Sequence, residues 1–475
     1  MANKFYITTA IPYVNATPHV GHALEFVQAD TVARIHRLLG DETCLLSGGD
    51  ENALKNVQAA EKAGIPLQEF IDKNSELFKQ LAQQLHVQFD IFQKGSDQEH
   101  HYSASQKLWK LCEHDIYKKS YEGLYCVGCE QYYTKDELNE NGECFEHPGK
   151  KLELVKEENY FFKLSSYQQQ LIDLISSDTI KIVPETKKNE MLSFLKQPLQ
   201  DISISRSNER AKNWGVPIPG DDTQRMYVWF DALNIYQSGI GFGWDETSYK
   251  KWWPADVHVI GKGIARFHAI YWPAFLLSAG LSLPKTILVH GYFTVDGQKM
   301  SKTVGNIVDP TALISKYGAE SLRYYFLKEL PTFADGDFSE RRFKELYNAD
   351  LANGLGNLTS RVAKLSGTVT YGKNTTTFKD VFKDEYKKMI DEFQLNDALG
   401  FVWEKIKICD KLINDKEPWR LSEPDRTPIL IDAVQQIQTI AILLQPFLPE
   451  TAERILTQFA GPTIASLPPL FPRLP

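Results

Sequence analysis

Two stretches of the chain alternate strand-like and helix-like patterns. In the first, residues 4–11 are rich in β-formers, apolar residues then recur at helical spacing, and a second apolar run follows at 42–48. In the second, residues 256–263 and 286–293 are predicted as buried strands on either side of a helix that ends at Gly280. Strand–helix–strand units favour a parallel sheet covered by helices, so we expect the two stretches to share one α/β sheet.

The remaining segments predict further domains around this sheet. Residues 116–226 are rich in turns and carry a cysteine cluster, which indicates an insertion between two halves of the sheet domain, 1–115 and 227–325. Asp309-Pro310 forms a favourable helix start, and long segments beyond it carry apolar residues at three- and four-residue spacing. Residues 326–475 are therefore expected to form a linker and an α-helical bundle.

The composition is that of an ordinary globular protein, with 43% apolar and 24% charged residues. No run of about 18 apolar residues occurs, which argues against a membrane span. The N-terminus begins directly on a strand-like pattern without a signal or transit segment, so a cytoplasmic location is expected. The net charge of −8 argues against indiscriminate binding to polyanions, although a local basic face would escape this count.

The segment TPHVGHALE, residues 17–25, places two histidines and a glycine at the start of the first predicted helix. Thr17 is expected to cap this helix and Pro18 to occupy its first position. A helix N-terminus presents unpaired N–H groups and partial positive charge, which suits a phosphate, and imidazoles add hydrogen-bond donors. Alone, the motif is weak evidence because short motifs recur by chance.

A second segment, GQKMSKTVGN at 297–306, follows the second strand–helix stretch. Lys299 and Lys302 flank a Met-Ser turn, so a loop here could bring two ammonium groups to a polyphosphate. A solvated surface loop is the usual explanation for two such lysines. The order of the histidine turn and this loop on a βα scaffold favours a nucleotide site instead.

Four potential zinc ligands lie within the predicted insertion. Cys126 and Cys129 form a Cys-x2-Cys pair, and after fourteen intervening residues Cys144 and His147 form a Cys-x2-His pair. Four sulfur and nitrogen ligands fill a tetrahedral Zn²⁺ and leave no open position, so the metal is expected to be structural. Disulfides would fit a cytosolic chain poorly. The remaining cysteines are isolated and are expected to be buried thiols: Cys44, Cys112 and Cys409.

The histidine and lysine segments resemble the two signature motifs of class I aminoacyl-tRNA synthetases, with Val20 in place of Ile and Thr303 in place of the final Ser. The surrounding sequence resembles that of the methionyl-tRNA synthetase family from about residue 4 to about 460, as in ITTAIPYVNATPHVGHALE, YVWFDAL, HGYFTVDGQKMSK and NGLGNLTSR. The resemblance implies a Rossmann-like catalytic domain, a connective insertion with a zinc knuckle, and a helical anticodon-binding bundle.

The resemblance also implies a reaction. Mg²⁺-bound ATP would activate L-methionine to methionyl-adenylate, and the methionyl group would pass to the 3′-terminal adenosine of tRNA(Met), including initiator tRNA. His19, His22, Lys299 and Lys302 would stabilise charge on the triphosphate. Further ATP contacts are implied for Gly21, Glu25, Gly261, Met300 and Ser301.

Two more sets of residues are implied by the same resemblance. The methionine pocket would be lined by Ala10, Ile11, Tyr13, Trp229, Tyr236, Ile264, His268 and Trp272, with Asp50 binding the substrate ammonium. The anticodon would be read by Asn357, Arg361 and Trp419. In each set, core packing or a solvated surface position is the plain structural alternative.

The sequence departs from the family pattern at Gly263, where the family usually has an Asp that helps position the adenosine or active-site charges, so that contact is unassigned in this chain. Arg206 matches a family arginine that helps organise the activation site, although the residues after it diverge. Two other functions stay open: an adenylate-forming ligase for another small acid, and a catalytically silent RNA-binding paralogue. A monomer is expected, because no appended dimerising module is visible.

Overall fold

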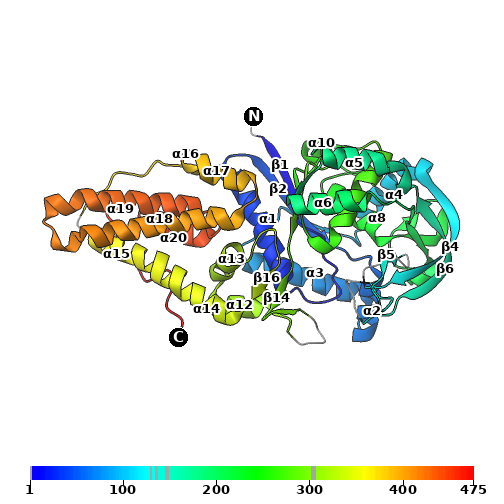
Figure 1. Ribbon diagram of the computed structural model, residues 1–475, viewed down its shortest axis with the longest axis horizontal. Helices are drawn as coiled ribbons and strands as arrows, with labels where there is room; N and C mark the ends of the chain where they lie inside the picture. The colour runs from blue at the N-terminus through cyan, green and yellow to red at the C-terminus, as the bar shows by residue number, and fades with distance from the viewer. Residues whose placement is uncertain (1–2, 129–130, 134–136, 145–148, 301–305, 368) are drawn as a thin grey trace.

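A six-stranded parallel sheet forms the centre of the computed structural model (Figure 1). Its strands follow the order β3-β2-β1-β12-β13-β7, and β1 pairs with β12 through Ile7 and Val257. The two alternating stretches therefore share one sheet, as predicted. Their apolar strands are buried because helices cover both faces. The strands span Ile91–Lys94 (β3), Glu42–Gly49 (β2), Lys4–Thr8 (β1), Val257–Gly261 (β12), Thr286–His290 (β13) and Lys181–Val183 (β7).

The structure describes residues 3–128, 131–133, 137–144, 149–300, 306–367 and 369–475. The helices of the sheet domain include α1 (Val20–Leu38), α2 (Leu54–Ala63), α3 (Leu67–Gln84), α4 (His101–Cys112), α8 (Val228–Ala232), α9 (Ile235–Ser238), α10 (Glu246–Trp252) and α11 (Trp272–Ser278). A wider π-turn, η5 (Phe267–Tyr271), leads into α11, and a short turn, η4 (Lys262–Ile264), precedes it. Gly280 ends this stretch in a left-handed conformation, as predicted.

The stretch predicted as one strand over 286–293 is two strands. β13 ends at His290, and β14 (Phe293–Val295) pairs with β15 (Gln298–Lys299) and β16 (Gly336–Phe338) in a separate small sheet. The chain bends at Gly291, where an added Cβ would lie only 2.1 Å from the carbonyl oxygen of Ala334. The bend at Gly291 separates β14 and β15 from the main sheet.

The predicted insertion does not form a separate body throughout, because β7 from within it pairs with β13 at the edge of the main sheet. The rest builds an antiparallel sheet in the order β5-β4-β6-β8 at one end of the molecule (Figure 1). A smaller sheet, β10-β11-β9, joins it to the core. These elements are β4 (Ile116–Cys126), β5 (Gln131–Tyr133), β6 (Glu153–Phe162), β8 (Ile202–Ser203), β9 (Ser205–Ser207), β10 (Pro217–Ile218), β11 (Asp221–Met226), α5 (Gln168–Ser176), α6 (Glu185–Phe194) and α7 (Asn208–Ala211).

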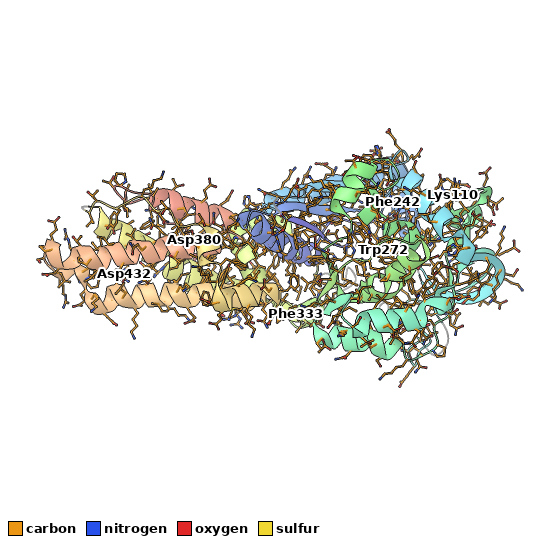
Figure 2. The ribbon with its side chains drawn as sticks, turned by 90° about the horizontal axis from the view of Figure 1, so that it is seen from above. Lys110, Phe242, Trp272, Phe333, Asp380 and Asp432 are labelled. Atoms are coloured by element: carbon orange, nitrogen blue, oxygen red, sulfur yellow. The ribbon has the colours of Figure 1, made fainter. Side chains whose placement is uncertain are left out.

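The C-terminal third is helical, as predicted, and extends from the sheet domain as an elongated bundle (Figure 1). In the view from above, Asp432 marks the bundle and Trp272 the interior of the sheet domain (Figure 2). By length and composition alone, helix α19 could cross a membrane, but it packs against α18 and α20 as a core helix. The helices are α12 (Pro310–Tyr317), α13 (Ala319–Lys328), α14 (Glu340–Leu346), η6 (Tyr347–Gly356), α15 (Asn357–Ser366), α16 (Phe378–Val381), α17 (Asp384–Asp391), α18 (Leu395–Lys416), α19 (Glu423–Leu444) and α20 (Pro449–Gln458).

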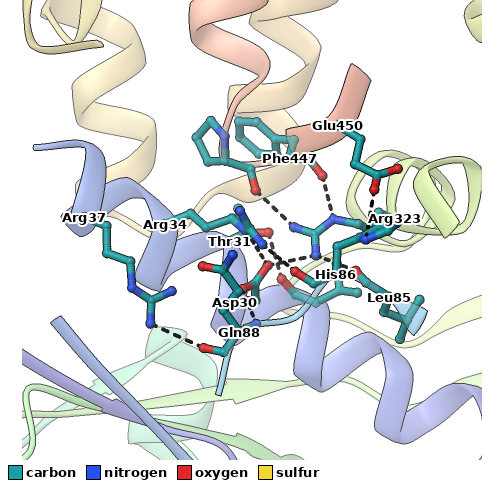
Figure 3. A network of polar contacts seen from close by, with 12 residues as sticks. Asp30, Thr31, Arg34, Arg37, Leu85, His86, Gln88, Arg323, Phe447 and Glu450 are labelled. Carbon is teal, nitrogen blue, oxygen red and sulfur yellow. Dashed lines mark hydrogen bonds and ion pairs between the residues drawn. The ribbon is translucent and has the colours of Figure 1, made fainter. Parts of the chain in front are cut away.

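One buried guanidinium joins the sheet domain to the bundle (Figure 3). Arg323 of α13 forms an ion pair with Asp30 of α1 at 2.8 Å, and both side chains are fully buried. Its other N–H groups donate to the carbonyl oxygens of Phe447 (2.8 Å), Pro446 (3.1 Å) and Leu85 (3.1 Å). The helix that begins at the histidine turn is thus bonded directly to the base of the bundle.

Candidate active site

Helix α1 begins two residues later than predicted. The helix starts at Val20, so Thr17 is not its cap; His19 takes that place. The Gly21 N–H donates to His19 Nδ1 at 3.0 Å, and the His19 N–H donates to His22 Nδ1 at 3.1 Å. Because each Nδ1 accepts a hydrogen bond, each neutral imidazole carries its proton on Nε2.

Both imidazoles are suited to donating hydrogen bonds rather than carrying charge. Their rings stack at 3.9 Å. Burial, and then the neighbouring His19, lower the pKa of His22 well below its ordinary value of 6.5. His22 therefore stays neutral at physiological pH and offers an Nε2–H donor at the helix N-terminus.

The second signature segment returns to this turn. The Val20 N–H points to the carbonyl oxygen of Val308 at 3.4 Å, two residues past the end of the 297–306 segment. Met300 packs against the core cluster that includes Val20. The backbone of Lys299 lies in β15, whereas Ser301, Lys302 and Thr303 lie outside the described residues. Val308, nearly three hundred residues from Val20 in the sequence, is therefore a neighbour of the histidine turn.

The Glu25 side chain contacts two segments at the carboxyl edge of the sheet. One carboxylate oxygen accepts from the Ala10 N–H at 2.8 Å, and the other lies 2.9 Å from His290 Nε2. Gly261 ends the adjacent strand β12, and a Cβ added there would lie 3.6 Å from the His290 ring. The predicted ATP residues Glu25 and Gly261 therefore gather at the carboxyl ends of β1, β12 and β13, where ligands bind in open α/β sheets.

Tyr236 and His268 form a buried, uncharged pair in the predicted methionine pocket. His268 Nδ1 lies 2.9 Å from the Ile264 carbonyl, so this nitrogen carries the proton, and Nε2 accepts from the Tyr236 hydroxyl at 2.7 Å. Burial lowers the pKa of His268 to about 4, and it raises the pKa of Tyr236 well above 10. The pocket thus presents neutral groups, which suit a thioether better than a charged side chain would.

Aromatic rings build the wall beside this pair. Trp229 stacks on Phe267 at 3.8 Å, and Tyr13 approaches Trp229 edge-on at 6.2 Å. Asp50 is buried and forms an isolated parallel bridge with Tyr13. Phe267 was missed in the sequence, because residues that are adjacent in a helix point to different faces and the position of His268 gives no signal for it. The half-buried Ala10, Ile11 and Ile264 pack against the same cluster.

Trp272, also predicted for the pocket wall, is fully buried like Tyr236 and His268. Its ring lies 6.5 Å from Tyr236 and 6.0 Å from Trp253.

Gly263 is matched to Tyr292. A Cβ at residue 263 would lie 1.8 Å from the Tyr292 hydroxyl oxygen, so any side chain there must displace that ring. Asp335 holds Tyr292 through its backbone N–H at 2.9 Å and also pairs with Lys262 at 2.5 Å. Gly263, where this chain departs from the family pattern, thus allows the η4 turn to pack against Tyr292 just before β14.

The predicted zinc knuckle is described in part. Cys126 and Cys144 are buried with their sulfur atoms 3.2 Å apart, while Cys129 and His147 lie outside the described residues. The two sulfur atoms are too far apart for a disulfide, whose S–S bond is about 2.05 Å long. Two buried thiols side by side are donors of the kind that Zn²⁺ prefers. Within the described ranges, no group of three His, Cys, Asp or Glu side chains is placed to hold a metal.

The knuckle contacts the pocket through Lys55 and Arg206. Lys55 Nζ donates to the Gly128 carbonyl at 3.0 Å and lies 3.0 Å from the centre of the Tyr13 ring. The Arg206 guanidinium lies near the rings of Tyr125 and Tyr227. Sequence patterns carried no signal for Lys55, because its partners come from distant segments.

The three predicted anticodon residues lie on the bundle. Asn357 and Arg361 are one turn apart on α15, and Asn357 is exposed. The Arg361 guanidinium lies 5.8 Å from the ring of Trp419 and pairs with Asp410 at 2.8 Å. Trp419 is 48% exposed, so it is not a core residue.

The chain matches the family model described as tRNA synthetases class I (M) over residues 5–363, well over half its length. It belongs to the methionyl-tRNA synthetase family. It is 39% identical to a methionine–tRNA ligase of Brucella melitensis, covering 97% of this chain and 92% of that protein. It is also 39% identical to a methionine–tRNA ligase of Thermotoga maritima, covering 95% of this chain and 74% of that protein.

Solved structures of the family share the whole fold. Methionyl-tRNA synthetase of Mycobacterium tuberculosis in complex with methionyl-adenylate superposes with a TM-score of 0.91 at 36% identity, covering 99% of this chain and all of that chain. The α/β class I fold followed by a helical region is therefore confirmed.

Proposed function

We propose that this methionyl-tRNA synthetase activates L-methionine with ATP and transfers the methionyl group to the 3′-terminal adenosine of tRNA(Met), initiator tRNA included. The observation that supports the proposal most directly is the contact between Val20 and Val308, because Val308 follows the lysine segment by two residues. A ligase for another small acid would not need the neutral methionine pocket and the exposed Arg361–Trp419 pair together.

In the first step, a methionine carboxylate oxygen attacks the α-phosphorus of ATP and pyrophosphate leaves. His19 and His22 donate through Nε2, and Lys299 and Lys302 neutralise charge on the phosphates. In the second step, a ribose hydroxyl of the terminal adenosine attacks the adenylate carbonyl, loses its proton, and AMP leaves. No protein nucleophile is needed, since positioning and electrostatic stabilisation supply the catalysis.

Binding of the amino acid would use the groups around Tyr236 and His268. Asp50 would bind the substrate ammonium, and Trp229 and Tyr13 would contact the thioether from the aromatic wall. Gly21, Gly261, Met300 and Ser301 would complete the ATP site beside Glu25. Mg²⁺ would accompany ATP and neutralise phosphate charge.

Zinc would be held by Cys126, Cys129, Cys144 and His147, as a structural ion that keeps the knuckle against Lys55. A purified chain that folds with no zinc would contradict this. The protein is further proposed to be a soluble, cytoplasmic monomer. Size-exclusion chromatography with light scattering would contradict the monomer if the mass were twice the 54.2 kDa of the chain.

The test is pyrophosphate exchange into ATP, measured with each amino acid in turn. Methionine alone should support exchange. Lys302→Ala should reduce the exchange rate by about 100- to 1,000-fold, because it removes one donor to the transition state. Its affinity for methionine, measured by calorimetry, should stay close to that of the unmodified chain. If none of the amino acids supports exchange, the enzyme assignment is overturned. If the Lys302→Ala variant exchanges at the rate of the unmodified chain, the role of Lys302 is overturned.

A further inference from the structure

The order of strands in the main sheet reverses between β1 and β12. From β1 the chain continues to β2 and β3 on one side, and from β12 it continues to β13 on the other. Ligands of open α/β sheets bind in the crevice outside the carboxyl ends of the two strands at such a reversal. Here α1 follows β1, and Gly261 ends β12. Phosphates bound at the N-terminus of α1 would therefore place the attached ribose beside the end of β12.

An aromatic ring lies over this end of β12. The Tyr292 Cε1 atom is 3.4 Å from a Cβ added to Gly261, and the Tyr292 hydroxyl oxygen is 1.8 Å from a Cβ added to Gly263. The hydroxyl thus occupies the volume that a side chain at residue 263 would fill. Tyr292 is 38% exposed, so its ring is not part of the core and a ligand in the crevice can reach it.

Tyr292 is held in this position by the segment before β16. Its N–H donates to the Asp335 carboxylate at 2.9 Å, and its carbonyl oxygen accepts from the Gly336 N–H at 3.0 Å. Lys262 Nζ lies 5.0 Å from the centre of the ring and pairs with the same Asp335 carboxylate at 2.5 Å. Because these contacts fix the ring before a ligand arrives, little conformational freedom is lost on binding.

The groups beside the ring belong to the predicted ATP site. The His290 ring lies 3.6 Å from the same added Cβ of Gly261, and His290 Nε2 lies 2.9 Å from Glu25. Tyr292 therefore shares its surroundings with Glu25 and Gly261. A phenol hydroxyl both donates and accepts hydrogen bonds, as a ribose hydroxyl does, so the two can pair in either direction.

We propose that Tyr292 is a specificity-determining residue of the ATP site, and that its hydroxyl forms a hydrogen bond with a ribose hydroxyl of ATP beside the η4 turn. Gly263 provides the space in which this hydroxyl lies. The inference rests on the proposed function, which supplies ATP as the substrate. The pattern of the sequence gave no signal for Tyr292, because its partners come from η4 and from the segment before β16.

The first test compares ATP with 2′-deoxy-ATP and 3′-deoxy-ATP in methionine-dependent pyrophosphate exchange. The unmodified chain should discriminate in kcat/KM against at least one of the two analogues. Tyr292→Phe keeps the ring and removes the hydroxyl, so it should reduce this discrimination about three- to tenfold, the effect of one hydrogen bond. The KM for methionine should not change. Tyr117→Phe is the matched control, because it removes a hydroxyl that donates to Asp201 in the insertion, and it should discriminate like the unmodified chain.

A second test measures the fit between residues 263 and 292. Gly263 is outside the left-handed region, so its backbone accepts alanine. Gly263→Ala adds a Cβ that displaces the Tyr292 hydroxyl and should therefore raise the KM for ATP. In a chain that already carries Tyr292→Ala, the same change should have no further effect on this KM.

Three results have distinct meanings. If Tyr292→Phe discriminates as strongly as the unmodified chain, or if the unmodified chain uses both analogues as well as ATP, the hydroxyl does not bind the ribose and the inference is overturned. If Gly263→Ala raises the KM for ATP equally with and without Tyr292, the inference is overturned as well. If the unmodified chain shows no methionine-dependent exchange with ATP, the proposed function fails first.

Discussion

At the scale of single residues, the methionine pocket depends on imidazoles that stay neutral. In the unfolded chain a histidine takes up a proton near pH 6.5, whereas folded His268 stays neutral down to about pH 4. Between these values the unfolded state binds more protons, so the free energy of unfolding falls as the pH is lowered. From pH 6.5 to pH 5 this one group should account for about 2 kcal/mol.

His268→Gln should therefore flatten the pH profile of stability, measured by urea unfolding at pH 7 and pH 5. Burial also lowers the pKa of His22 and His258, and these residues remain in the variant. Because the charge of His268 also lowers the pKa of His258, the difference reports His268 together with its effect on His258. His114→Gln, at an exposed imidazole, serves as the control and should follow the unmodified chain. A glutamine variant with an equally steep loss of stability would contradict the assignment.

At the scale of elements, the end of the bundle brings α15 and the turn after α18 together. Arg361 lies 5.8 Å from the Trp419 ring, and the ring is half exposed. Base stacking on an exposed ring contributes about 1–3 kcal/mol. Trp419→Ala should therefore raise the KM for tRNA about tenfold while pyrophosphate exchange stays unchanged.

The matched control for this change is Trp244→Ala. Trp244 is 45% exposed, like Trp419, but it follows α9 in the sheet domain and packs on His100. Its removal should leave the KM for tRNA unchanged. Equal effects of the two substitutions would show that Trp419 acts through folding rather than through the anticodon.

At the scale of the whole molecule, the Arg323–Asp30 pair holds the bundle to the sheet domain (Figure 3). Without Arg323, Asp30 keeps its ion pair with Arg34 at 2.7 Å, but the carbonyl oxygens of Phe447, Pro446 and Leu85 lose their donor. At about 1 kcal/mol or more for each unsatisfied buried group, the loss costs about 3 kcal/mol or more in total. Arg323→Met should lower the free energy of unfolding by this amount and should separate unfolding of the bundle from that of the sheet. Arg342→Met, which breaks an exposed pair with Glu329, should cost under about 1 kcal/mol. If the two substitutions lowered the free energy of unfolding in urea equally, this role of Arg323 would be contradicted.

Local patterns were enough to predict the alternating strands, the helical C-terminal third and the motifs themselves. These patterns failed where segments far apart in the sequence pack against each other. The predicted strand 286–293 breaks because Gly291 meets the 334–335 backbone, and β7 leaves the insertion because β13 offers it an open edge. His19 replaces Thr17 as the cap because its own Nδ1 reaches the Gly21 N–H.

The sequence by itself determined the family, the periodicity of the elements and the residues that carry the chemistry, because these depend on residue type and spacing along the chain. The tertiary structure alone decided which groups meet: Gly263 with Tyr292, Lys55 with the knuckle, and Arg323 with Asp30. Contacts between residues 30 to 300 positions apart leave no periodic trace in a single sequence, since they arise only when packed elements exclude water together.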